Sequence, residues 1–380
     1  MKNFILLGAT GSIGTQVLDI IRKDNNFKLL GFSFGNNIKK AIEIIKEFKP
    51  KYVAITNLEY INSFNEFSDL NVFSGDDSLS KLVNMSEDYV LINSVSGIAG
   101  LKPTICAIKN HKDILLANKE TLVCAGEIIN KLVKENNVNL IPIDSEHSAI
   151  SQCLKVGSKN EIKNIIITAS GGAFRDKNRG ELDNVTLEDA TCHPNWSMGT
   201  KITIDSSTMV NKGLEIIEAH FLFDVPYEKI KTVIHKESII HSMVEYFDGS
   251  VIAHLATPDM HLPIMYAMYY PHHLKGVTPS LDFNKLKNLS FEEMNYERFP
   301  MVELAYKVGE LSGVMPLVYS TSNEVAVELF KQGKIKYLDI ENIINEMVNN
   351  YIDKNILNPT LDDLIEIDQK VRKDVLEEWS

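Results

Sequence analysis

The sequence predicts an α/β protein: a parallel sheet in the first 150 residues, then an α+β region, then a helical C-terminal part. Up to about residue 150, short apolar runs alternate with longer amphipathic stretches, as in βαβ units. From about 150 to 275, apolar runs are separated by loops rich in Gly, Ser, His and Asn. After Pro279 and Pro300, apolar residues recur at helical spacing.

The elements follow from these patterns in chain order. In the first part we expect strands at 3–7, 28–34, 52–55, 89–93, 114–117 and 140–143, with helices between them that include 15–22 and 121–134. In the central part we expect extended segments at 162–168, 230–235, 238–246 and 250–255. In the last part, Thr321-x-x-Glu324 and Thr360-x-x-Asp363 have the pattern of capped helix starts.

Composition limits the function classes. The chain has 380 residues, enough for two or three domains, and 44% apolar positions exclude a disordered protein. The net charge of −12 disfavours general binding to nucleic acid or membrane phosphate, so a phosphate ligand needs a local site. The four cysteines form no C-x-x-C pair, which favours a reducing, cytoplasmic setting. We find no targeting signal and no apolar segment of membrane-spanning length.

A glycine-rich turn follows the first expected strand and opens the first expected helix. Its sequence, Gly8-Ala9-Thr10-Gly11-Ser12-Ile13-Gly14, suits close approach of backbone N–H groups to a pyrophosphate. The spacing differs from the usual G-x-G-x-x-G, and such turns also occur without ligands. This turn therefore indicates a dinucleotide site only in combination with other motifs.

The end of the second expected strand bears on cofactor choice. An Asp or Glu here would hold the ribose 2′-hydroxyl of NADH. The segment instead reads Ser33-Phe34-Gly35-Asn36-Asn37-Ile38-Lys39-Lys40, with no acid and two lysines. This favours NADPH over NADH.

Carboxylates follow the expected strand at 140–143. Asp144 and Glu146 are two residues apart, so in extended chain they point to the same side, at the strand end where open sheets bind ligands. Their oxygens suit Mg²⁺ or Mn²⁺, although solvated loop charge is the alternative. Glu215 is a candidate third ligand, since Asn211, Lys212 and Glu215 share a helix face; a surface Lys–Glu pair is the alternative there.

Other segments combine anion-binding and covering side chains. Ala169-Ser170-Gly171-Gly172 offers a hydroxyl and flexible backbone donors, and Asp205-Ser206-Ser207-Thr208 is expected to open a helix; the serines also suit N-caps. Cys192–Gly199 carries an imidazole, an indole and a thioether, which indicates a lid, with core packing of Trp196 as the alternative. Lys119, at another strand end, suits polarisation of a substrate oxygen or is an ordinary surface lysine.

Together these motifs resemble the 1-deoxy-D-xylulose 5-phosphate reductoisomerase family over essentially the whole chain. GATGSIG, LLANKE, PIDSEHSAI, ASGGAF, CHPNWSMG, IDSSTMVNKGLE, IHSMVEY, DGSV and TPDM occur in the family's order and spacing. The resemblance implies an N-terminal Rossmann-like NADPH-binding domain (1–148), a central α+β catalytic and dimerisation domain (149–278), a linker (279–299) and a C-terminal α-helical bundle (300–380).

The resemblance also implies residue roles. It implies NADPH contacts by Thr10, Gly11, Ser12, Ile13, Gly35, Asn36, Asn37, Asn118, Glu120 and Gly199. It implies metal ligation by Asp144, Glu146 and Glu215. It implies substrate contacts by Lys119, Ser145, Glu146, Ser170, His193, Trp196, Met198, Ser206, Asn211, Lys212 and Glu215. Among these, Lys119, Glu146, His193 and Glu215 are the expected catalytic residues.

The implied reaction couples rearrangement of a five-carbon ketose phosphate, by retro-aldol and aldol steps, with hydride reduction of the resulting aldehyde to 2-C-methyl-D-erythritol 4-phosphate. It implies NADPH, one divalent cation and a homodimer, with no nucleic-acid or membrane partner. Asn36 departs from the family, because many relatives have a basic residue near the adenosine 2′-phosphate; Lys39 or Lys40 is the expected substitute. Ala173 replaces a frequent proline, which we expect to be harmless.

Two other functions fit parts of the pattern. One is a different NADP-dependent semialdehyde or sugar dehydrogenase, which would not need the D-S-E and K-G-L-E carboxylates. The other is a nucleotide-sensing or structural protein that has kept the fold but lost catalysis. The intact carboxylates and the complete lid segment argue against the second.

Overall fold

The computed structural model describes residues 1–196, 198–276 and 278–380. The chain divides into two compact units, each described separately. Unit 1 comprises residues 1–121, 127–148 and 260–278, and unit 2 comprises residues 122–126, 149–259 and 279–380. Within the described ranges, no helix combines the length and apolar character that crossing a membrane requires. The expected boundaries at 148, 278 and 299 stay predictions.

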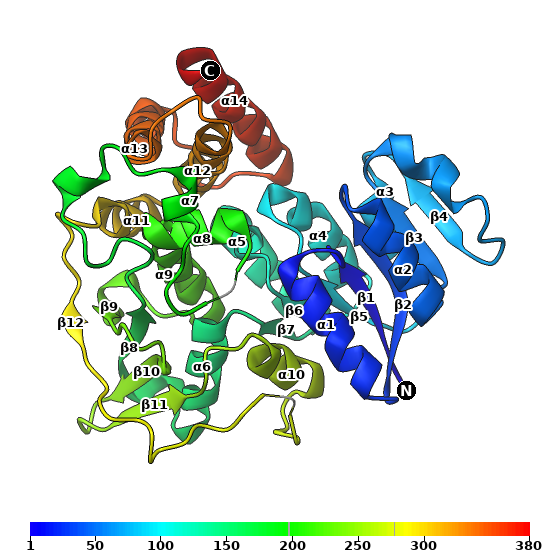
Figure 1. The fold of residues 1–380 in the computed structure, drawn as a ribbon, viewed down its shortest axis with the longest axis horizontal. Helices are drawn as coiled ribbons and strands as arrows, with labels where there is room; N and C mark the ends of the chain where they lie inside the picture. The colour runs from blue at the N-terminus through cyan, green and yellow to red at the C-terminus, as the bar shows by residue number, and fades with distance from the viewer. Residues whose placement is uncertain (197, 277) are drawn as a thin grey trace. The chain divides into compact units, whose positions relative to one another are not determined.

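Unit 1 is built on a seven-stranded sheet in the order β4-β3-β2-β1-β5-β6-β7, with every neighbouring pair parallel (Figure 1). The strands are β1 (Lys2–Leu7), β2 (Phe27–Phe34), β3 (Tyr52–Ile55), β4 (Asn71–Ser74), β5 (Val90–Asn93), β6 (Ile114–Leu116) and β7 (Leu140–Pro142). The helices of this part are α1 (Ser12–Lys23), α2 (Ile38–Phe48), α3 (Ser78–Val83), α4 (Leu101–Lys109) and α5 (Lys119–Asn136). This is the expected Rossmann-like arrangement.

Burial explains why these segments form strands. The runs Phe4–Leu7 and Val90–Asn93 are buried at every residue, as expected for parallel strands covered on both faces. All six strands predicted in this part are present, with ends within one residue of the prediction. β4 was not predicted, because its four residues are partly or fully exposed and carry no continuous apolar run.

Unit 2 contains a mixed five-stranded sheet in the order β11-β10-β8-β9-β12. Its strands are β8 (Ile162–Ala169), β9 (Ile230–Ile234), β10 (Ile240–Tyr246), β11 (Val251–Leu255) and the short β12 (Glu292–Glu293). β8 and β9 are parallel, and the other pairs are antiparallel. The helices up to residue 269 are α6 (Ser145–Cys153), α7 (Leu187–Ala190), α8 (Thr200–Ser207), α9 (Val210–Phe223) and α10 (His261–Tyr269), of which α10 and the start of α6 belong to unit 1.

The C-terminal part is helical, as predicted, with α11 (Pro300–Leu311), α12 (Met315–Lys331), α13 (Asp339–Tyr351) and α14 (Leu361–Trp379). The capping box at Thr360 and Asp363 is confirmed, because each side chain bonds the other residue's backbone N–H. The helix start predicted at Thr321 is wrong. Thr321 lies inside α12, where its hydroxyl donates to Asp368 (2.7 Å), so tertiary packing and not capping explains this threonine.

Candidate active site

The glycine-rich turn lies between β1 and α1, as the sequence predicts. Gly8 has φ +82°, and a Cβ there would lie 2.7 Å from the Ser94 carbonyl oxygen. A Cβ on Gly14 would lie 2.4 Å from the Gly8 carbonyl oxygen, so both positions require glycine. α1 begins after Gly11 without a side-chain cap. The first N–H groups of a helix have no intrahelical partner, so this end suits an anion.

A cation lies at the same turn. The Lys40 ammonium donates to the Thr10 carbonyl (3.3 Å) and to the Thr15 hydroxyl (2.5 Å), whereas Lys39 is exposed. Asn37 caps α2, because its side chain accepts the Lys40 backbone N–H at 3.1 Å. Of the two lysines left open by the sequence, Lys40 is therefore the one held at the turn, while Gly35 and Asn36 are exposed beside it.

Asn118 organises the start of α5. Its side chain accepts the Thr121 backbone N–H at 3.1 Å and donates to the carbonyls of Val95 and Gly97, both at 2.9 Å. Glu120 also accepts from Asn118, at 2.9 Å. These contacts connect the loops that follow β5 and β6, and Asn118 and Glu120 are both buried.

Asp144 is the centre of an ionic cluster in unit 1. It forms an ion pair with Lys119, and His147 Nδ1 lies 3.1 Å from its Oδ1. Burial acts to raise the pKa of the Asp144 carboxyl, but the charges of Lys119 and His147 and their hydrogen bonds outweigh burial, so this pKa lies well below its usual range. Asp144 is therefore a buried anion, which suits a metal ligand.

Asp144 and Glu146 follow β7 and lie close to one another, as predicted, but the extended backbone expected to bring them together is wrong. Ser145 and Glu146 do not continue the strand in extended form; they begin α6. Asp144 Oδ1 accepts the backbone N–H groups of Glu146 (3.1 Å) and His147 (3.3 Å), which stabilises that helix start. The Ser145 hydroxyl donates to Glu146 at 2.5 Å. Asp144 thus caps a helix, a role that its position after a strand does not indicate.

The face of α9 that carries Asn211, Lys212 and Glu215 is confirmed. Asn211 donates to Glu215 at 2.6 Å, and Lys212 forms an ion pair with the same carboxylate. Lys212 and Glu215 are 4% and 1% exposed, which rejects the surface-pair alternative. A buried ion pair of this kind is costly to desolvate and is a common feature of functional sites.

The loop after β8 turns sharply at two glycines. Gly171 and Gly172 both have positive φ, +83° and +71°. The Gly172 N–H donates to the Ser170 hydroxyl at 3.2 Å, and a Cβ on Gly172 would lie 2.4 Å from the Ser206 carbonyl oxygen. The backbone at Gly172 therefore packs closely against the backbone at Ser206. This contact brings together the loops that carry Ser170 and Ser206, two predicted phosphate contacts.

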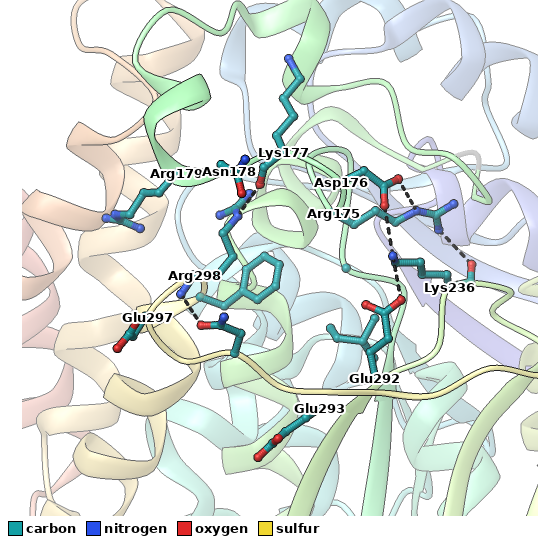
Figure 2. Close-up of a pocket in the computed structure, with 14 residues that line it drawn as sticks. Arg175, Asp176, Lys177, Asn178, Arg179, Lys236, Glu292, Glu293, Glu297 and Arg298 are labelled. Carbon is teal, nitrogen blue, oxygen red and sulfur yellow. Dashed lines mark hydrogen bonds and ion pairs between the residues drawn. The ribbon is translucent and has the colours of Figure 1, made fainter.

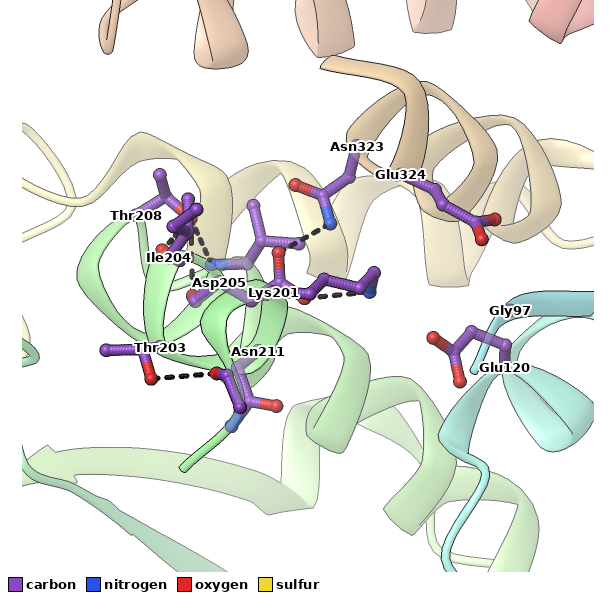
Figure 3. Close-up of polar contacts among 12 residues, drawn as sticks. Gly97, Glu120, Lys201, Thr203, Ile204, Asp205, Thr208, Asn211, Asn323 and Glu324 are labelled. Atoms are coloured by element: carbon purple, nitrogen blue, oxygen red, sulfur yellow. Dashed lines mark hydrogen bonds and ion pairs between the residues drawn. The ribbon is translucent and has the colours of Figure 1, made fainter. Parts of the chain in front are cut away.

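The segment Asp205–Thr208 does not open a helix, contrary to the prediction. Asp205, Ser206 and Ser207 are the last residues of α8, and α9 begins at Val210 after Met209, which has φ +62°. Asp205 is buried, and its carboxylate accepts from Lys201 (2.8 Å) and from Asn323 of α12 (2.9 Å), as Figure 3 shows. These contacts fix the end of α8 and with it Ser206.

The segment predicted as a lid is Cys192–Gly199, of which Ser197 lies outside the described residues. Trp196 is half-buried, and its ring centroid lies 5.8 Å from that of His241. Met198 is half-buried, and Gly199 is the exposed N-cap of α8. Burial, followed by the charge of Arg175, lowers the pKa of His193 to about 4. His193 is therefore neutral at physiological pH.

A cavity of about 600 Å³ is lined by Gly171 and mainly by charged residues (Figure 2). Arg175 Nη1 donates to the Lys236 carbonyl at 2.9 Å, and Lys236 Nζ pairs with Asp176 (3.1 Å) and Glu292 (2.8 Å). The sequence did not single out Arg175, Lys236 or Asn195. They are far apart in the chain, and no spacing rule connects them.

The chain is similar to known proteins over its whole length. Residues 4–126 match the family described as 1-deoxy-D-xylulose 5-phosphate reductoisomerase, residues 140–223 match that family's C-terminal domain, and residues 255–374 match the DXP reductoisomerase C-terminal domain. A 1-deoxy-D-xylulose 5-phosphate reductoisomerase of Clostridium botulinum is 50% identical over 379 residues, covering 98% of each chain. The protein of that name from Clostridium kluyveri is 48% identical and covers 100% of both chains.

Two solved structures show the same fold. One is a DOX-P reductoisomerase in complex with NADPH, fosmidomycin and magnesium, with a TM-score of 0.94, 35% identity and 100% coverage of both chains. The other is the 1-deoxy-D-xylulose 5-phosphate reductoisomerase of Zymomonas mobilis in complex with NADPH, with a TM-score of 0.91 and 38% identity, covering 100% of this chain and 99% of the other.

Proposed function

The chain belongs to the 1-deoxy-D-xylulose 5-phosphate reductoisomerase family, and from this premise we propose how its own residues perform the family's reaction. It converts 1-deoxy-D-xylulose 5-phosphate into 2-C-methyl-D-erythritol 4-phosphate in isoprenoid precursor biosynthesis, with NADPH and one divalent cation. The observation that carries this function is the agreement with named relatives at about half identity over 98% of the chain.

We infer that Asp144, Glu146 and Glu215 hold the divalent ion. Each offers a carboxylate oxygen as a ligand, and hard oxygen ligands of this kind accept Mg²⁺ and Mn²⁺ alike. The donor chemistry fits: Asp144 is kept anionic by Lys119 and His147, and buried Glu215 accepts from Asn211 and Lys212. When bound, the ion stabilises negative charge on substrate oxygens during carbon–carbon cleavage, and NADPH supplies the hydride.

For NADPH we propose the contacts implied by the family, at the glycine-rich turn and the α2 and α5 starts. The tight turn at Gly8 and Gly14 and the uncapped start of α1 support pyrophosphate binding there. Lys40, held at Thr10, is our candidate for the adenosine 2′-phosphate contact, in place of the basic residue that Asn36 replaces. Asn118 fixes the geometry around the cofactor by bonding two loop carbonyls.

For the substrate we propose two groups of side chains. Ser170, Ser206, Asn211 and Lys212 bind the phosphate, supported by the close packing of Gly172 on Ser206 and by the burial of Lys212. This remote binding energy orients the reacting carbons. Lys119, 7% exposed and paired with Asp144, adds fixed positive charge where substrate oxygens become negative.

We propose that Trp196 and Met198 cover the bound sugar phosphate. Both are half-buried apolar side chains in the segment before α8, and closure there would exclude water and retain the aldehyde intermediate. His193, whose low pKa keeps it neutral, contributes a hydrogen bond rather than a charge.

We further propose a cytoplasmic homodimer. The four cysteines are free thiols, in agreement with a reducing compartment. β11 is an edge strand. Its first residue, Val251, is 47% exposed, and Phe247, between β10 and β11, is 63% exposed, which supports a subunit contact there. Sedimentation of the purified chain tests this: a monomer at micromolar concentration rejects the dimer.

The function is tested by NADPH oxidation with 1-deoxy-D-xylulose 5-phosphate in the presence of Mg²⁺ or Mn²⁺ and after EDTA treatment. We expect turnover only with a divalent ion. Turnover that survives complete chelation would favour an ordinary sugar dehydrogenase instead.

A further inference from the structure

The two ring nitrogens of His193 have different hydrogen-bond partners. Nδ1 accepts the backbone N–H groups of Asn195 (3.1 Å) and Trp196 (3.0 Å). A nitrogen that accepts two N–H groups carries no proton, so the proton of the neutral ring lies on Nε2. Nε2 is 3.0 Å from the Ser170 hydroxyl and therefore donates to it.

The hydrogen bond from His193 helps to determine where the Ser170 hydroxyl can point its proton. Its oxygen accepts from His193 Nε2 (3.0 Å) and from the Gly172 backbone N–H (3.2 Å). A hydroxyl has two acceptor positions and one proton to donate. Because both acceptor positions are filled, the remaining function of this hydroxyl is donation, which suits an anionic oxygen.

Asn195 anchors the segment that carries His193. Its side-chain amide donates to the Lys236 carbonyl (2.5 Å) and to the Ser238 hydroxyl (2.7 Å), in the turn His235–Ser238 between β9 and β10. Arg175, from the loop of Ser170, donates to the same Lys236 carbonyl at 2.9 Å (Figure 2). The Lys236 carbonyl thus accepts a hydrogen bond from the His193 segment and another from the Ser170 loop, and so fixes the position of both.

We propose that Asn195 is a positioning residue for phosphate binding. It anchors the 193–196 segment at Lys236, so that the backbone N–H groups of residues 195 and 196 keep His193 as an Nε2–H donor and Ser170 directs its proton at the substrate phosphate. This role rests on the proposed function of Ser170. Nothing in the chain positions of these residues indicates it, because the contact joins segments 41 residues apart.

The test compares Asn195→Ala and Asn195→Asp with the wild-type chain and with Asn164→Ala. The Asp variant keeps the side-chain size but has no N–H donors. Asn164 is a half-buried asparagine of β8 whose amide donates to Glu245 (2.7 Å), so it controls for loss of an ordinary side-chain hydrogen bond. Two quantities are measured on the full chain: the KM and kcat for the sugar phosphate, and the His193 tautomer by ¹⁵N NMR of histidine-labelled protein, assigned with His193→Gln.

We expect both Asn195 variants to raise the KM for the sugar phosphate about tenfold, the effect of roughly one lost hydrogen bond, while the KM for NADPH is unchanged. We expect the wild-type His193 signal to show only the Nε2–H tautomer, and the variants to show a mixture. Asn164→Ala should match the wild type.

The proposal is overturned if wild-type His193 carries its proton on Nδ1, or if both Asn195 variants keep the wild-type KM and a single Nε2–H tautomer. Failure of the proposed function is a separate result, because it appears as absent turnover in the wild type. The tautomer measurement then still decides the positioning role, since it needs no substrate.

Discussion

Gly172 offers the sharpest test of how the phosphate pocket is built, by the substitution Gly172→Ala. The residue has φ +71°, and an added Cβ would lie 2.4 Å from the Ser206 carbonyl oxygen and 2.7 Å from the Ser207 Cα. Both obstacles are backbone atoms, so a side-chain rotation cannot relieve the overlap.

The expected cost has two parts. A non-glycine residue at such a φ costs roughly 1–3 kcal/mol, and overpacking adds about 1–3 kcal/mol, so roughly 2–6 kcal/mol is lost from the stability of unit 2. The midpoint of thermal unfolding should fall by roughly 4 to 24 °C. Because Ser170 and Ser206 are forced apart, the KM for the sugar phosphate should rise at least about tenfold.

Calorimetry and steady-state kinetics measure both effects. Gly180→Ala is the matched control, because a Cβ there meets no atom within 4 Å. Gly180→Ala should behave as the wild type. If Gly172→Ala instead keeps the wild-type unfolding midpoint and KM, the close contact between the two loops is not what shapes the pocket.

Four further predictions concern the cofactor, the metal, the substrate phosphate and pH. Lys40→Met should lower the NADPH-over-NADH preference in kcat/KM about tenfold, since a charged hydrogen bond to phosphate is lost, whereas Lys39→Met, at an exposed residue, should leave it unchanged. If Lys40→Met keeps the wild-type preference, Lys40 does not contact the 2′-phosphate. Glu215→Gln should lower kcat severely with a near-normal KM for NADPH, and retained turnover would remove Glu215 from the metal site. Lys212→Ala should chiefly raise the KM for the sugar phosphate, and an unchanged KM would remove Lys212 from the phosphate pocket. Because the pKa of His193 falls from 6.5 to about 4 on folding, the unfolded chain binds this proton first as pH falls, so the stability contributed by neutral His193 is present above pH 6.5 and is lost toward pH 4. His193→Gln should flatten the pH dependence of the unfolding free energy between these values, and an unflattened curve would contradict the low pKa.

The sequence predicts the elements whose signals are local. The β1–turn–α1 unit, the shared face of Asn211, Lys212 and Glu215, and the Thr360 capping box depend on neighbours within a few residues, and all three are confirmed. Periodicity and capping rules act over that same range.

Sequence patterns give wrong predictions where tertiary contacts decide the local structure. Thr321 resembles a helix cap but lies inside α12, where Asp368 accepts its hydroxyl proton. The residues after β7 were expected to stay extended, but Asp144 caps α6. The partnership of Asn195 with Lys236 has no local signal at all, because it arises only when the 193–196 segment packs on the β9–β10 turn.

The central claim is that this chain rearranges and reduces 1-deoxy-D-xylulose 5-phosphate with NADPH. The most direct measurement is mass spectrometry of the product formed with NADPH that carries deuterium at the transferred position. The account predicts 2-C-methyl-D-erythritol 4-phosphate with one deuterium at the newly formed primary alcohol. A reduced product that keeps the unbranched carbon skeleton, or a branched product without deuterium, would contradict it.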